Sequence, residues 1–141
     1  MKRIHLFTLL SVLAVALSVG VLPGVAEASG GGGSQNQVTI QPQASYILTD
    51  SAINVGLNVK CQGGSGNVTV DLTQSPPATP SPIAHGDGTQ IVVCDGQTHT
   101  VAVTVSGFGF DAGTASATAD LTAPTGVAHA QRSINIVVVN G

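Results

Sequence analysis

The chain has few charged side chains, and this shortage excludes several classes of function. Only four Lys and Arg and seven Asp and Glu occur among 141 residues. Proteins that bind nucleic acid or anionic lipid surfaces use clusters of basic residues against phosphates. Beyond residue 28 the only such cations are Lys60 and Arg132, which are far apart in the sequence. We therefore expect no nucleic-acid partner and no attraction to a charged membrane surface.

Aromatic residues and glutamates are equally scarce. The chain has no Trp, and Tyr46, Phe108 and Phe110 are the only aromatic residues after residue 28. A stacking platform for sugars is therefore not expected, because it needs flat ring faces. No Glu follows Glu27, and neither a carboxylate pair for glycoside hydrolysis nor a Gly-x-Ser-x-Gly nucleophile motif is recognisable. The sequence predicts no catalytic residue, no cofactor and no enzyme.

The first residues have the pattern of a cleavable secretory signal. Lys2 and Arg3 precede an apolar run over residues 6–22, and a small-x-small pattern ends at Ala28. We expect a signal helix that is cleaved between Ala28 and Ser29, which places the mature chain outside the cell or in association with its wall. The alternative is a retained anchor, although the run is shorter than the roughly 20 apolar residues of a membrane span. After cleavage no membrane contact is expected.

This pattern divides the chain into three segments. Residues 1–28 are the predicted signal peptide, and residues 29–37 form a spacer rich in Gly and Ser. Residues 38–141 have the length of one ordinary domain, which is long enough to bury a core without a metal.

Alternation of apolar and polar residues with a period of two predicts strands throughout this domain. Val38 and Ile40 begin the series, in a strand expected to end at Pro42. The later positions that share one face are Ile53, Val55, Leu57, Val59 and Cys61, then Val68, Val70 and Leu72, then Val101, Val103 and Val105, then Ala115, Ala117, Ala119 and Leu121, and finally Ile134, Ile136 and Val138. The fold class predicted is all-β, an immunoglobulin-like antiparallel two-sheet sandwich of about seven strands with one disulfide, preceded by the signal helix.

Turn residues predict how some of these strands connect. The glycine-rich residues 63–66 are expected to form a turn between two strands. Asp95 and Gly96 separate residues 91–94 from residues 99–105, so we expect these two runs to form a hairpin. The alanine-rich strand leaves little volume on its inner face, and Phe108 and Phe110 are candidates to fill it.

Cys61 and Cys94 are the only cysteines. In an exported chain an even pair predicts a structural disulfide. Closing a loop of about 34 residues stabilises a protein by about 3.8 kcal/mol in the chain-entropy estimate. Period two directs Cys61 into the core and leaves Ile91 and Val93 on the face opposite to Cys94. That strand therefore needs either cover on both faces or a bulge.

His85, His99 and His129 are the mature histidines, and their spacing matches no zinc site. We expect structural roles for them, with His99 bonded to the backbone near Asp95. The stretch from Ser75 to Gly88 contains four prolines and reads as a crossover loop, or alternatively as a stiff recognition loop.

Several of these residues together resemble a known group of proteins. They are Cys61 with the following glycines, the strand at residues 68–72, residues 94–101, and the Gly-Thr-Ala start of the alanine strand at residues 113–115. This pattern resembles small secreted proteins of actinomycetes with an immunoglobulin-like sandwich and a single disulfide, a group of uncharacterised activity. The resemblance implies a fold and a location and no catalytic residue. A second likeness is to the apoproteins of enediyne chromoproteins, which have two disulfides where this chain has cysteines for one.

The function expected from the sequence is that of a secreted or cell-surface, non-enzymatic β-sandwich domain. It acts as a binding or structural module for an unknown protein or small ligand outside the cell. The alternative is a small-ligand carrier or protease inhibitor that acts through the stretch from Ser75 to Gly88 or through a cleft.

Overall fold

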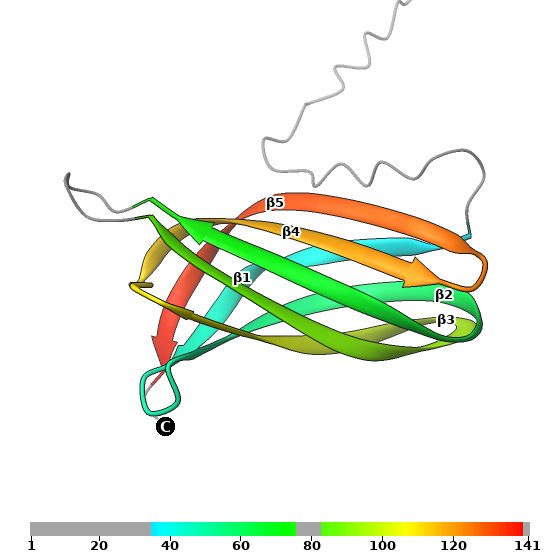
Figure 1. The fold of residues 1–141 in the computed structure, drawn as a ribbon, viewed down its shortest axis with the longest axis horizontal. Helices are drawn as coiled ribbons and strands as arrows, with labels where there is room; N and C mark the ends of the chain where they lie inside the picture. Colours follow the sequence, from blue (N-terminus) through cyan, green and yellow to red (C-terminus); the bar gives the residue numbers. More distant parts are fainter. Residues whose placement is uncertain (1–34, 76–82, 140–141) are drawn as a thin grey trace, which may run out of the picture.

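A computed structural model describes residues 35–75 and 83–139, and nearly all of them lie in five long strands (Figure 1). The strands are β1 (Gln37–Ile47), β2 (Ala52–Gln74), β3 (Ala84–Phe108), β4 (Gly113–Ala123) and β5 (Gly126–Val139). The prediction of an all-β fold is confirmed. The predicted signal peptide and its cleavage site between Ala28 and Ser29 lie outside the described residues. Among the residues described, no helix long and apolar enough to span a membrane occurs.

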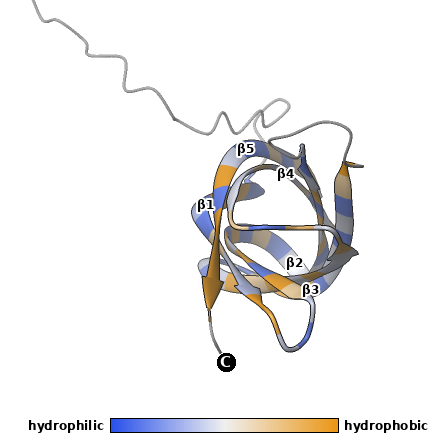
Figure 2. Ribbon diagram, turned by 90° about the vertical axis from the view of Figure 1, so that its left-hand side faces the viewer, coloured by the Kyte–Doolittle hydropathy of each residue, from blue (hydrophilic) through white to orange (hydrophobic). Residues whose placement is uncertain are grey.

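The strands form a single sheet that closes on itself as a small barrel. Its order is β1-β5-β4-β2-β3, and an additional pairing between β1 and β2 completes the ring. The pairing of β1 with β5 is parallel and the other pairings are antiparallel. Seen from one end, the strands follow one another around the core (Figure 2).

The strands β2 and β3 pair along nearly their whole length, and their two halves lie in two parts of the barrel wall that we call layers. Residues 52–60 of β2 lie between β1 and the C-terminal half of β3. Residues 67–73 of β2 lie between β4 and the N-terminal half of β3. We call β1, residues 52–60 of β2 and the C-terminal half of β3 the first layer. The second layer consists of residues 67–73 of β2, the N-terminal half of β3, β4 and β5.

Both long strands bend where one layer passes into the other. The register between β2 and β3 shifts between Lys60 and Gly64, and the backbone of Gly63, Gly64 and Gly96 has positive φ values. Glycine adopts this region without steric cost, so the ribbon can turn sharply here. The glycine turn expected at residues 63–66 is therefore a bend inside one strand.

The hairpin expected at Asp95 and Gly96 is wrong. Residues 91–94 and 99–105 belong to the same strand, and each pairs with β2 rather than with the other. Turn residues mark a change of direction both in a hairpin and in a bend within one strand, and only the choice of the paired strand distinguishes the two. That choice depends on contacts with β2, more than 20 residues earlier in the chain.

The core consists of the inward positions of the alternating pattern, as predicted. The fully buried larger side chains come from every strand except β3's N-terminal half, and they include Ile40, Leu57, Leu72, Val103, Leu121 and Ile136. Phe110 is also buried, at 5% exposure, and its ring lies over Gly86 and Gly107. Phe108 is 90% exposed, so the expectation that it fills the core is wrong. It ends β3 on an outward position, before Gly109 turns the chain with a positive φ.

Polar contacts close the places where strands separate. The Arg132 Nη1 atom donates to the Ile40 carbonyl oxygen at 2.9 Å, across the opening between β5 and the start of β1. The buried Gln74 side chain accepts a hydrogen bond from the Asp111 backbone N–H at 2.8 Å and donates one to the Asp111 carbonyl oxygen at 3.0 Å. These two bonds hold the connection between β3 and β4 against the end of β2.

The stretch from Ser75 to Gly88 differs from its predicted form. Residues 84–88 are part of β3, and Gln74 pairs directly with Ala84. The stretch therefore joins two neighbouring antiparallel strands and is not a crossover. Residues 76–82 lie outside the described residues. Alternation was difficult to recognise here because three of the first five strand residues are Gly or Ala, which carry little hydrophobic signal.

Candidate interaction faces

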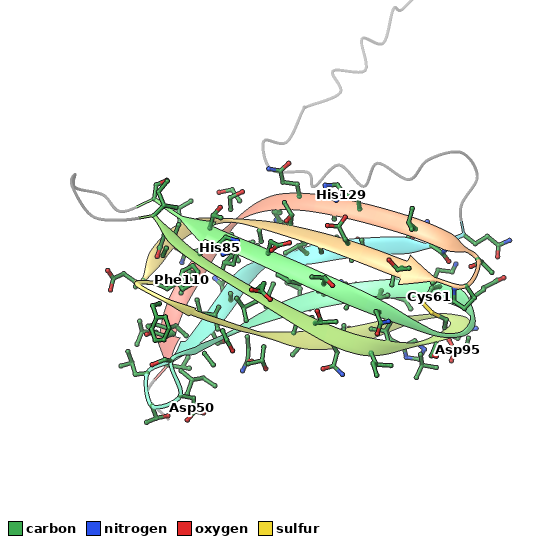
Figure 3. All side chains as sticks on the ribbon, in the orientation of Figure 1. Asp50, Cys61, His85, Asp95, Phe110 and His129 are labelled. Carbon is green, nitrogen blue, oxygen red and sulfur yellow. A yellow bond between two sulfur atoms is a disulfide. The ribbon has the colours of Figure 1, made fainter. Side chains whose placement is uncertain are left out.

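The predicted disulfide is present at the bend that connects the two layers. The Sγ atoms of Cys61 and Cys94 are 2.05 Å apart and the Cα atoms 4.5 Å apart, and both residues are buried. Cys61 and Asp95 lie at the same end of the molecule, opposite to the end that carries Asp50 and Phe110 (Figure 3). Because the bond joins β2 to β3 beside their shared bend, it holds the two layers in a fixed relation.

Asp95 organises the backbone at this bend. Its Oδ1 atom accepts a hydrogen bond from the Gln97 backbone N–H at 2.9 Å and lies 2.8 Å from the His99 Nε2 atom. The contact with His99 and the bond from Gln97 lower the pKa of Asp95 below its ordinary value of 3.8. The expected bond of His99 to the backbone is thus replaced by a contact with the Asp95 side chain.

The outer face of the second layer carries carboxylates and histidines. The His129 Nδ1 atom lies 2.7 Å from the Asp120 Oδ1 atom, and the His85 Nε2 atom lies 3.9 Å from the Asp71 Oδ1 atom. Asp71 pairs directly with Asp87 across β2 and β3, so two like charges stand opposite each other. Such a pair destabilises a sheet. Within the described ranges, no group of three or more His, Cys, Asp or Glu side chains could hold a metal ion.

This face also exposes apolar side chains at its margins. Ile91 and Val93 on β3 are 70% and 58% exposed, and Val127 on β5 is 66% exposed. The strict alternation of β3 continues through residues 91–94, with Val92 and Cys94 buried. Neither of the two expectations for this strand holds, because no bulge interrupts residues 91–94 and the described residues leave Ile91 and Val93 exposed.

The outer face of the first layer is uncharged along most of its length. The Thr100 and Thr104 hydroxyl groups donate to the side-chain carbonyl oxygens of Asn58 and Asn54, each at 2.9 Å. Gly56 pairs with Ala102 between these two bonds. This face therefore satisfies much of its own hydrogen-bonding capacity through pairs across β2 and β3.

The comparisons with known proteins add no relative. No protein-family model matches the chain, and no curated protein matches it. The assignment of a functional face depends on the geometry described above.

The alternating pattern contained the signal for the outer face of the second layer, because His85, Asp87, Ile91 and Val93 all occupy odd positions that lie outward together. What it lacked was the pairing of β3 with β2, which brings Asp71 opposite Asp87.

Proposed function

We propose that this chain is a secreted or wall-associated, non-enzymatic binding module that recognises a macromolecule outside the cell. Export is supported by the signal pattern at residues 1–28 and by the disulfide, since such bonds persist in oxidising compartments. The observation that carries the binding role is the exposure of Ile91 and Val93 on a regular strand that is anchored by its own buried residues. Exposed apolar side chains in neighbouring positions are typical of contact surfaces.

The finer fold assignment belongs to the same proposal. The bends divide β2 and β3 into halves, so the five strands provide seven segments in two layers. This arrangement supports an immunoglobulin-like sandwich and is consistent with the resemblance to small secreted actinomycete proteins. Domains of this architecture use sheet faces and end loops for binding, which fits the location proposed.

The binding surface that we propose is the outer face of the second layer, with the apolar pair at one margin and the carboxylates beside it. Protein interfaces commonly combine apolar contact area with neighbouring polar groups. Ile91 and Val93 supply apolar area, and Asp87 and Asp71 supply charge that discriminates between partners.

The test is capture of partners from the culture medium and wall fraction of the producing organism, identified by mass spectrometry. A double variant, Ile91→Thr with Val93→Thr, keeps β-branched side chains in the strand and is expected to lose the captured partner. The matched control is Asn54→Ala with Asn58→Ala on the first layer, which should retain it. Equal capture by both variants would contradict the proposed face.

A further inference from the structure

Beyond Gly88, the N-terminal half of β3 presents an unpaired strand edge, whereas Gly86 and Gly88 lie close to the backbone of Ser106 and Thr104 in the C-terminal half of the same strand. Throughout residues 84–106, β3 pairs with β2, and the sheet order places β3 at its end. Among the described residues no other strand pairs with it. An edge strand displays a row of backbone N–H and C=O groups that can pair with another chain.

This edge lacks the features that usually prevent such pairing. Proteins protect exposed edges with charged side chains, prolines or bulges. Residues 88–94 contain none of these charged residues or prolines, and no register shift interrupts them. Ile91 and Val93 stand beside the edge with most of their side-chain surface exposed. The disulfide at Cys94 and a 3.2 Å contact between the hydroxyl groups of Thr69 and Thr89 hold both ends of this segment on β2.

The sequence of this edge is complementary to itself. When two antiparallel copies of one strand pair about a two-fold axis, residues at equal distances from the centre stand opposite each other on the same face. A centre at Val92 places Ile91 of each copy opposite Val93 of the other. Four exposed apolar side chains then gather in one cluster, and each buries surface that the single chain leaves in water.

Charge selects this register over its nearest alternative. With the centre at Val92, Asp95 stands opposite Thr89 and Asp87 stands opposite Gln97, so no carboxylates face each other. With the centre at Ile91, Asp87 of each copy would stand opposite Asp95 of the other, twice. Like charges directly opposite each other destabilise a sheet.

We propose that the partner of this edge is a second copy of the chain, joined by antiparallel pairing of residues 89–95 with Val92 at the two-fold axis. The pairing makes one continuous sheet from the second layers of both copies. This inference rests on the proposed function, since it names the partner of the same face. Pairing over roughly 20 Å of strand forms a small interface, so we expect dissociation in the micromolar range.

The test is sedimentation equilibrium of the full exported chain with its disulfide intact, over a concentration series from low micromolar to millimolar. The wild type is expected to pass from monomer to dimer in this range. The double variant Ile91→Thr with Val93→Thr should raise the dissociation constant at least tenfold, and Val127→Thr should leave it unchanged. Circular dichroism establishes that each variant is folded.

Crosslinking tests the register separately. With a short bis-maleimide, a mixture of the Ile91→Cys and Val93→Cys variants should give far more crosslinked dimer than either variant alone, because Ile91 of one copy stands opposite Val93 of the other. The native cysteines do not react, since they are already bonded to each other. Efficient crosslinking of Ile91→Cys alone would overturn the register. A wild type that stays monomeric at millimolar concentration would overturn the dimer. If that monomer still captures another protein through Ile91 and Val93, the proposed function stands and only the self-association fails.

Discussion

The outer faces of the two layers share the strands β2 and β3, and yet these two strands present different side chains on each face. On the first layer, Asn54 and Asn58 accept bonds from threonines directly across the strand pair. On the second layer, Asp71 opposes Asp87 and β3 exposes Ile91 and Val93. The fold needs only the inward positions to be apolar, so it does not require either set of outward residues. A face whose outward residues stabilise the sheet less than those on another face of the same molecule is the better candidate for function.

The largest effect is expected where both layers depend on one bond. Replacing Cys61 and Cys94 together by Ala should lower the free energy of unfolding by about 3–4 kcal/mol, because the disulfide restricts the unfolded chain. Urea unfolding at neutral pH measures the change, and reduction of the wild type should reproduce it. A loss of less than about 1 kcal/mol would show that the bend is held by packing alone.

Two glycines distinguish how tightly the layers are packed. A Cβ atom on Gly88 would clash with the Thr104 backbone oxygen, so Gly88→Ala should lower the free energy of unfolding by about 1–3 kcal/mol. A Cβ atom on Gly56 would instead meet the movable end of the Gln41 side chain. Gly56→Ala should therefore be neutral or slightly stabilising, since Ala restricts the unfolded chain. Thermal unfolding compares the stability of the two variants. An equal loss of stability in both would contradict the close contact between Gly88 and Thr104 in the two halves of β3.

Substitutions on the two outer faces should have opposite signs. Asp87→Asn removes one of two opposed carboxylates and should raise the free energy of unfolding by about 0.2–1 kcal/mol at low salt. Asn58→Ala removes the acceptor of the Thr100 hydroxyl and should lower it by about 0.5–1 kcal/mol. The gain in Asp87→Asn should decrease in 1 M NaCl, because salt screens exposed charges, whereas the loss in Asn58→Ala should not. A salt-independent gain would argue against charge repulsion.

The smallest effect concerns the Asp95 side chain at the bend. Its pKa is lowered in the folded chain by His99 and by the Gln97 backbone N–H, so its ionised form stabilises the fold. This contribution is present above the ordinary value of 3.8 and is lost as the pH falls through the lowered folded value. The difference in stability between wild type and Asp95→Asn should therefore narrow below pH 3.8. Unfolding curves at several pH values measure it, and a difference that stays constant through this range would contradict the assignment.

Much of the core could be predicted from alternation alone. The inward positions of β2 and β4 were identified residue by residue, for example Leu57, Leu72 and Leu121, because burial on one face imposes a period of two. Asp95 with Gly96 does not distinguish a bend from a hairpin, because both use the same residue types. Alternation places Ile91 and Val93 outward, but their exposure could not be predicted because it depends on which strand lies next to β3.

The sequence by itself determined the all-β class, the inward positions and the partners in the disulfide, because these follow from local periodicity and from the presence of only two cysteines. Tertiary structure decided which strands are continuous, which histidine meets which aspartate, and where an edge stays open. These features depend on pairings between residues distant in sequence, and their cost in chain entropy is repaid only when the whole sheet closes. The contrast between the two outer faces belongs to this second group, since β2 and β3 supply both.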